Sequence, residues 1–320
     1  MAITDSLVIT RTIEKIKILL GNTILQALED PKTVELMLNS DCTVWVEKLG
    51  SGMEELCQMS SCSSLDLIQT VASFHSKIAN ESHPVLECEF PLDGSRFAAQ
   101  IFPCVQSPTF TIRKKAVSIF TLSQYVENGV MSEAQKDIIL TAVKNHRNIL
   151  VIGGTGSGKT TLVNAVIESM VQNNPKERLV IIEDTGEIQC SAKNNVQFHT
   201  APNVSMTDLL KTTLRMRPDR ILVGEVRGPE ALDLLMAWNT GHEGGAATVH
   251  ANNPVAALER IALLISMNRD YPKPIEPLIA SCVHVIVHIA RVGHGRKISS
   301  ILKVNGYDNI NKCYLTEEIT

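Results

Sequence analysis

The stretch Gly153-Gly154-Thr155-Gly156-Ser157-Gly158-Lys159-Thr160 decides the fold of this 320-residue chain. It matches the Gly-x-x-x-x-Gly-Lys-Thr pattern of a phosphate-binding loop. The apolar residues 148–152 before it predict a buried parallel strand, and residues 161–167 after it have apolar side chains at helical spacing. In this order of strand, loop and helix, backbone N–H groups and the positive end of the helix dipole attract phosphate.

The loop also carries the side chains that a nucleoside triphosphate needs. We expect Lys159 to neutralise the β- and γ-phosphates and the Thr160 hydroxyl to hold Mg²⁺. The residues predicted to bind the nucleotide here are Gly153, Gly154, Thr155, Gly156, Ser157, Gly158, Lys159, Thr160 and Thr161.

Length and composition favour a soluble protein of two domains. The chain is 44% hydrophobic and 20% charged, and its eight cysteines form no C-x-x-C pair, which favours a reducing compartment. No apolar run approaches 18 residues, and the first ten residues do not have the pattern of a signal peptide. We therefore expect a cytoplasmic location. A zinc site among Cys57, Cys62, His75, His83 and Cys88 is an alternative whose spacings fit no standard set.

The charge distribution favours no nucleic-acid groove. The net charge is −4, and residues 1–115 hold 10 Lys+Arg against 14 Asp+Glu. Only residues 113–115, Arg-Lys-Lys, are locally basic in that half of the chain. Duplex DNA binding requires a basic stripe, so we expect no direct contact with nucleic acid.

The first 113 residues predict a small α/β domain. Residues 7–28 have the spacing of an amphipathic helix broken near Gly21, and residues 43–47 alternate like a strand before a turn at 50–52. Residues 65–80 look helical, and 85–113 contain two or three short strands. Residues 114–130 read as a linker.

Residues 131–320 predict an α/β domain with a mostly parallel sheet covered on both faces. Ser132 and Gln135 can cap a helix that runs to about residue 144. After the phosphate loop, strand candidates at 179–183, 220–224, 246–250 and 283–290 alternate with helical segments.

Two acidic residues end apolar strands in this second domain. Glu225 follows the apolar run 221–223, and Glu183 follows 181–182 in the segment Glu183-Asp184-Thr185-Gly186-Glu187. Ligands of open α/β sheets bind at the carboxyl ends of the strands, so both carboxylates are candidates for catalysis and for Mg²⁺, partly through water. A solvated loop carboxylate is the alternative for either one alone.

Two histidines form a further marked segment, residues 240–251, which includes His242 and His250. A structural hydrogen bond is the more common role of a single histidine. Their position after the Glu225 strand favours contact with the nucleotide, as sensors of the γ-phosphate.

These four segments together resemble the secretion ATPase superfamily. The sequences GGTGSGKT, IIEDTGEI, RPDRILVGEVRG and GHEGGAATVHA follow the order of its Walker A, Asp, Walker B and His boxes. The stretch at residues 29–52 is similar to the opening domain of type IV secretion and conjugative-transfer members. The chain lacks the tetracysteine module of type II secretion and pilus-extension enzymes and the AIRNLIRE-like segment of retraction enzymes. It therefore most resembles the TrbB-type conjugative-transfer ATPases.

The resemblance implies a RecA-like ATPase domain, ATP and Mg²⁺ as ligands, and a homo-hexameric motor. It also implies inner-membrane components of a conjugation machine as partners and a location peripheral to the inner membrane. In such enzymes arginines of the N-terminal domain or linker reach the nucleotide, and Arg96 and Arg113 match these positions. Arg215 and Arg227 are further candidates. The resemblance leaves open whether Glu225 or Glu183 is the main base, and whether the arginines act within or between subunits.

A different class of function remains as an alternative. A RecA-like helicase or strand-exchange enzyme would also carry a phosphate loop, but it needs a basic groove with aromatic stacking platforms, and only 4% of the residues are aromatic. A GTPase would carry an Asn-Lys-x-Asp guanine reader, which the chain lacks.

Overall fold

The computed structural model describes residues 2–115, 119–201, 203–293 and 295–319 and divides into two compact units, Met1–Val117 and Ser118–Thr320. Residues 116–118 of the predicted linker lie outside the described residues. The linker's second half is folded, because α3 (Leu122–Glu127) lies there and begins with a capping box between Thr121 and Gln124. Tyr125 of α3 packs into the core of the second unit, so that unit begins before residue 131.

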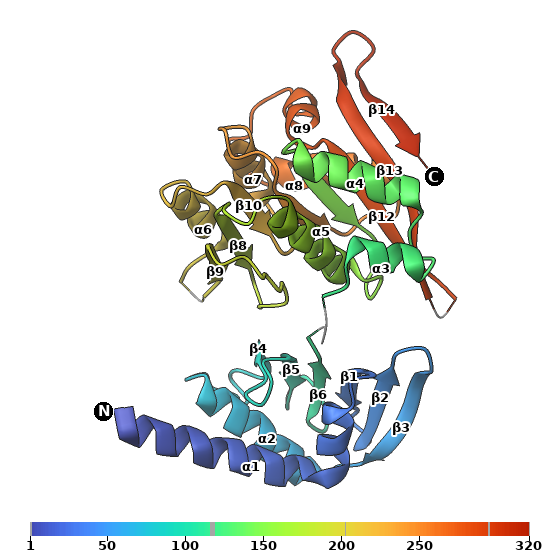
Figure 1. Ribbon diagram of the computed structural model, residues 1–320. Coiled ribbons are helices and arrows are strands. Elements are labelled where there is room, and N and C mark those ends of the chain that lie inside the picture. The colour runs from blue at the N-terminus through green and yellow to red at the C-terminus, as the bar shows by residue number, and fades with distance from the viewer. Residues whose placement is uncertain (1, 116–118, 202, 294, 320) are drawn as a thin grey trace. The chain divides into compact units, whose positions relative to one another are not determined.

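The first unit is an antiparallel six-stranded sheet with α1 (Ala2–Glu29) and α2 (Ser61–Phe74) packed on one face (Figure 1). The strands are β1 (Thr33–Leu38), β2 (Thr43–Lys48), β3 (Gly52–Gln58), β4 (Val85–Glu89), β5 (Arg96–Gln100) and β6 (Thr109–Arg113), in the order β3-β2-β1-β6-β5-β4. The predicted break in the first helix is present, since Gly21 has φ 72° and ψ 166°.

The second unit is built on an eight-stranded sheet in the order β14-β13-β12-β7-β11-β10-β8-β9. Strands β9 (Asn195–His199), β8 (Leu179–Glu183), β10 (Arg220–Val223), β11 (Ala246–Val249), β7 (Ile149–Ile152) and β12 (Val285–Val292) are parallel. The hairpin of β13 (Gly295–Asp308) and β14 (Cys313–Ile319) adds two antiparallel strands at one edge. The predicted mostly parallel sheet is confirmed, while β9, β13 and β14 were not predicted.

Helices cover both faces of this sheet, and they bury the central strands along their whole length. One face packs α3, α4 (Glu133–Lys144) and α5 (Lys159–Asn173). The other packs α6 (Met206–Thr213), α7 (Glu230–Trp238), α8 (Pro254–Ser266) and α9 (Glu276–Cys282). Because the strands are parallel, the loops that follow β7, β8, β10 and β11 meet at one edge of the sheet, the edge formed by the carboxyl ends of the strands.

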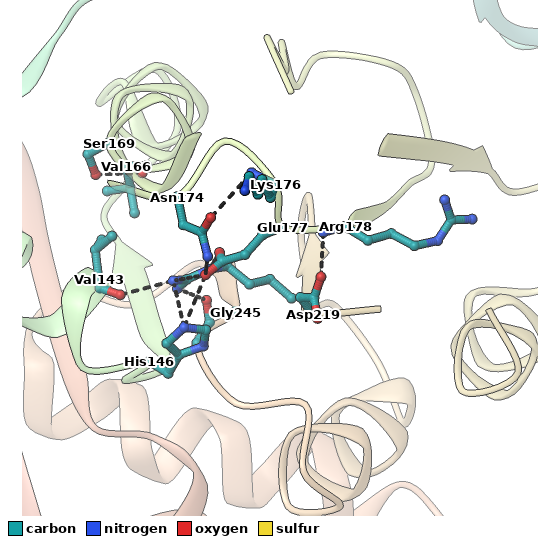
Figure 2. Close-up of polar contacts among 12 residues, drawn as sticks. Val143, His146, Val166, Ser169, Asn174, Lys176, Glu177, Arg178, Asp219 and Gly245 are labelled. Atoms are coloured by element: carbon teal, nitrogen blue, oxygen red, sulfur yellow. Dashed lines mark hydrogen bonds and ion pairs between the residues drawn. The ribbon is translucent and has the colours of Figure 1, made fainter. Parts of the chain in front are cut away.

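A buried ion pair lies at the opposite edge of the sheet, where the parallel strands begin. Arg220, which is 0% exposed, pairs with Glu177, and its guanidinium donates to the carbonyl oxygens of Gly244 and Val143 at 2.9 and 3.1 Å. Figure 2 shows His146 and Glu177 in this cluster, with His146 Nε2 at 3.1 Å from Glu177 Oε1. These contacts tie together the starts of several strands and the end of α4.

Candidate nucleotide-binding site

The glycine-rich loop leaves β7 and enters α5 through backbone conformations that only glycine adopts easily. Gly153 has φ +155°, and Gly158, the N-cap of α5, has φ +95°. A methyl group on Gly153 would lie 2.2 Å from the carbonyl oxygen of Ile289 and 2.6 Å from the Ser157 hydroxyl. The loop is therefore closed too tightly for side chains at these glycines.

Two polar groups inside this loop suit a phosphate ligand. Lys159 is 8% exposed, and its ammonium donates to the carbonyl oxygens of Gly153 and Gly154 at 3.1 and 3.0 Å. The buried Ser157 hydroxyl has no hydrogen-bond partner among the described residues. An unpaired buried hydroxyl is costly, and a bound phosphate oxygen would satisfy it.

Thr160 lies next to a carboxylate, as a magnesium site requires. Its Oγ1 donates to Glu187 Oε2 at 3.2 Å. Mg²⁺ in phosphate-transfer sites takes one or two protein oxygens and completes its shell with phosphate and water. No group of three or more His, Cys, Asp or Glu side chains in the described part of the chain could hold a metal alone. The pair fits a cation that is shared with the nucleotide.

The sequence makes Glu183 a candidate for catalysis and for Mg²⁺, which stays a prediction, and the described contacts place a different carboxylate beside Thr160. The carboxylate that contacts Thr160 belongs to Glu187. Glu183 is only 2% exposed, and its Oε1 accepts hydrogen bonds from the backbone N–H groups of Glu187 and Ile188 at 3.0 and 2.8 Å. Glu183 thus shapes the loop that presents Glu187.

Glu225 stands at the tip of β10 between two partners. Its Oε2 accepts from Arg227 at 2.7 Å, and its Oε1 lies 3.0 Å from His250 Nε2. Burial raises the pKa of Glu225, but the Arg227 hydrogen bond and the nearby positive charges outweigh it, so the net pKa is lowered. The carboxylate is ionised, and its reduced basicity suits the orientation of water.

His250 joins the Walker B and Walker A segments. It follows β11, which lies between β7 and β10, and each of its ring nitrogens is 3.4 Å from Lys159 Nζ. Burial and then the charge of Lys159 lower the pKa of His250, and Glu225 opposes them. The predicted place of His250 beside the terminal phosphate is therefore consistent with its contacts.

His242 lies at the opposite end of the parallel strands from the phosphate loop, so its position does not support the predicted contact with the nucleotide. It precedes β11, whereas the phosphate loop follows the parallel β7. The nearby Gly244 and Gly245 donate to Asn148, the residue before β7, at 2.7 and 3.0 Å. A four-residue strand of about 13 Å separates this loop from the phosphate loop.

The two predicted N-terminal arginines are brought together in the first unit. Arg96 on β5 is paired with Arg113 on β6, and both point away from the α1 and α2 side, where Phe97 and Ile112 are buried. The other two residues of the basic triplet have structural partners within this unit: Lys114 donates to the Asp30 carbonyl oxygen at 2.9 Å, and Lys115 pairs with Glu89 at 3.2 Å.

Sequence reasoning missed several side chains at the phosphate-loop edge. Glu187 is the last acid of its segment, and the sequence pattern alone assigns it no role. Arg227 is a candidate near Walker B, but the sequence does not predict that it pairs with Asp184 at 3.8 Å as well as with Glu225. Arg296, on β13, reaches the carbonyl oxygen of Gly156 at 3.4 Å, and only its place in a basic turn hinted at this. Arg215 follows α6 and is exposed.

Comparison with known proteins shows what this chain is similar to. A family model described as "Type II/IV secretion system protein" matches residues 77–312. The "Probable conjugal transfer protein TrbB" of Sinorhizobium fredii is 44% identical over 96% of this chain and 95% of its own length. The "Type IV secretion system protein VirB11" of Bartonella quintana is 30% identical over 86% of this chain and 89% of its own. The solved ATPase DotB of Legionella pneumophila has a similar fold, with TM-score 0.62 and 19% identity over 87% of this chain and 79% of its own.

Proposed function

The chain belongs to the type II/IV secretion system protein family, among the TrbB-type secretion ATPases that its sequence resembles, and on this premise we propose that it hydrolyses MgATP to power conjugative transfer through a type IV secretion machine. One relationship carries the proposal. Lys159 of the phosphate loop, His250 and Glu225 form a continuous chain of contacts at 3.4 and 3.0 Å. The three residues come from three different strand ends, so they bring phosphate binding and water activation to one place.

Phosphate binding uses the loop and the first turn of α5. Loop N–H groups and the helix dipole attract the β-phosphate. Lys159 exchanges its contacts with the Gly153 and Gly154 carbonyl oxygens for phosphate oxygens. The carbonyl contacts hold the ammonium within the loop until the nucleotide arrives.

Thr160 and Glu187 would hold Mg²⁺. When bound, the ion neutralises charge on the β- and γ-phosphates. The Thr160 hydroxyl, which now donates to Glu187, would turn to offer its lone pair to the ion. Glu183 acts indirectly, because its hydrogen bonds fix the backbone at Glu187.

Glu225 orients the attacking water, and His250 keeps Glu225 in place. A carboxylate with a lowered pKa accepts a hydrogen bond from water without removing its proton in the ground state. Arg227 occupies one carboxylate oxygen, which leaves the oxygen facing His250 and the phosphate loop for this role. Arg96 and Arg113 would stabilise charge that develops on the phosphate, an effect of about 10³–10⁵ in related phosphoryl transfers.

The motor itself is the wider part of the proposal. We place this chain in a homo-hexamer at the cytoplasmic face of the inner membrane, where it contacts membrane components of the secretion machine. The support is the kind of protein to which it is similar, a conjugal transfer protein and a type IV secretion protein. None of the helices in the described residues has the length and apolar character needed to cross a membrane.

Phosphate release by the purified chain tests the proposal. We expect turnover with MgATP, none with ATP and a chelator, and none for Lys159→Ala, whose fold should be intact. Single-stranded DNA should not stimulate turnover at low or high salt. Strong, salt-sensitive stimulation would instead favour a helicase-type enzyme, and normal turnover by Lys159→Ala would reject the site. Particle images with nucleotide would show whether a six-membered ring forms.

A further inference from the structure

The two sides of β7 have different chemistry. On one side lie β11 and then β10, with His250 and Glu225 at their carboxyl ends. On the other side lies β12, which runs parallel to β7 and continues into the antiparallel β13. If the terminal phosphate lies at Glu225, the nucleoside end of the nucleotide must leave the loop elsewhere, and the β12 side is adjacent to the loop.

The β12 side presses closely on the phosphate loop. The carbonyl oxygen of Ile289 would lie 2.2 Å from a methyl group on Gly153. A methyl group on Gly158 would lie 2.9 Å from Cδ and 3.1 Å from Nε of Arg296. The stem of Arg296 therefore lies across Gly158, which is possible because this N-cap residue has no side chain.

The Arg296 guanidinium extends from this contact along the loop. Its Nη2 lies 3.4 Å from the carbonyl oxygen of Gly156, the guanidinium's only hydrogen bond within the described ranges. The residue is exposed, so its planar face and most of its donors remain available to a ligand. Arg291 is its direct partner across the hairpin, so the surroundings are cationic.

We propose that Arg296 binds the nucleoside end of the nucleotide, with its guanidinium plane stacked on the base. The inference rests on the proposed ATPase function and deepens it by assigning a residue that selects a nucleotide over bare phosphate. Phosphate already has the loop N–H groups, Ser157 and Lys159 as partners. A planar cation held by its stem offers what a base requires, a rigid surface for stacking and cation–π attraction.

Calorimetric titration of the full chain with ATP, ADP and inorganic tripolyphosphate, each with Mg²⁺, tests the proposal. Arg296→Ala should weaken ATP and ADP binding about tenfold, as expected for loss of a cation–π contact. Tripolyphosphate binding should change less than about twofold, and kcat at saturating ATP should stay near the parent value while KM rises. Arg296→Lys should not restore affinity, because it keeps the charge and loses the plane.

Lys297→Ala is the matched control, since it removes the same charge from the neighbouring position of β13, on the other face of the strand. It should bind all three ligands as the parent does. Equal weakening of ATP and tripolyphosphate by Arg296→Ala, or rescue by Arg296→Lys, would show a phosphate contact and overturn the assignment. Unchanged nucleotide binding would also overturn it.

Lys159→Ala separates this inference from the proposed function. If it fails to weaken both ATP and tripolyphosphate, the phosphate site itself is wrong. If it weakens both while Arg296→Ala changes neither, only the assignment of Arg296 fails. Arg296→Gln serves as the test variant if the alanine protein does not fold.

Discussion

Arg96 and Arg113 stand directly opposite each other on β5 and β6 of the first unit. The same row continues to Glu35, which is opposite Arg113 on β1, and to Glu89, which is opposite Arg96 on β4. Directly opposed side chains lie about 5 Å apart at Cβ, and like charges at this distance are destabilising. The flanking carboxylates offset the repulsion between the two arginines, and the two adjacent guanidinium groups can bind one anion together.

Arg113→Ala should lower ATP turnover strongly, by about 10³-fold if it acts as arginines do in other phosphoryl transfers. The melting temperature should hardly change, because a half-exposed arginine contributes little packing. Steady-state phosphate release and thermal unfolding of the same preparation measure both effects. A large fall in melting temperature would assign Arg113 a structural role.

Mixing variants tells whether Arg113 acts within its chain or between subunits. If sites are shared, Arg113→Ala mixed with Lys159→Ala should regain turnover, because some sites combine an intact Lys159 with an intact Arg113 from different chains. Subunit exchange has to be shown independently, for example with labelled chains. If subunits exchange and the mixture gains no ATP turnover, Arg113 acts at the site formed by Lys159 of its own chain.

Glu35 should act on turnover through Arg113. Burial raises the pKa of Glu35 and outweighs the charge of Arg113, which lowers it, so the net pKa is raised and the carboxyl group is partly desolvated beside the guanidinium. We expect Glu35→Gln to lower kcat several-fold with little change in KM, and to add nothing in an Arg113→Ala background. Glu87→Gln should leave kcat and KM unchanged, because Glu87 lies on the same face of β4 as Glu89 but two residues away from it. Additive effects would mean that Glu35 acts independently of Arg113.

Some of the fold could be predicted because its signals are local. The strands around the phosphate loop are short apolar runs, and Ser132 with Gln135 marked the start of α4. The hairpin β13–β14 could not be predicted in this way. Irregular register at Val304 and Gly306 disturbs the alternation that indicates a strand.

The two differences between the expected and the observed positions at the site have different causes. The roles of Glu183 and Glu187 depend on a loop that folds back so that Glu183 accepts the N–H group of Glu187, and no local pattern reveals such a contact. His242 could have been placed correctly. A residue before a predicted parallel strand lies at the opposite edge from a loop that follows one.

The three carboxylates should give three different phenotypes. Glu225→Gln should bind MgATP but turn it over about 10²–10⁴ times more slowly, since the amide keeps the shape and loses the charge. Glu187→Gln should raise the Mg²⁺ concentration needed for half-maximal turnover. Glu183→Gln should mainly lower the melting temperature. Slower chemistry in Glu183→Gln than in Glu225→Gln, with unchanged stability, would return the main role to Glu183.

The buried pair Arg220–Glu177 should be essential for stability. Glu177→Gln would leave the fully buried guanidinium without a counter-charge, and breaking such a pair costs about 3–5 kcal/mol. Urea unfolding of the full chain would measure this loss as a lower midpoint for the second unit. Glu243→Gln, an exposed carboxylate near the same cluster, should change stability by less than about 0.5 kcal/mol. Equal midpoints for the two variants would contradict the role of the pair.

Stability should fall as the pH drops below about 6.5, and His250 should account for part of the fall. Its pKa is lowered in the folded state, so the unfolded chain binds the proton more readily and protonation favours unfolding. Burial lowers the pKa of His284 and His288 in the same way. Glu225 does not contribute in this range, because its lowered pKa keeps it ionised until the pH falls below its ordinary value of 4.5.

The His250 share can be isolated by comparing melting temperatures of the parent and His250→Gln between pH 8 and pH 5.5. Between these pH values the melting temperature of the parent should fall by roughly 1 °C more than that of the variant. The difference is small because this ring is partly exposed and solvent weakens its interactions. His83→Gln, which removes an exposed histidine of the first unit, is the control and should follow the parent curve. A variant curve parallel to that of the parent would mean that the folded site accepts the imidazolium. Glu225 would then be holding a charged partner, and His250 would be able to donate a proton during turnover.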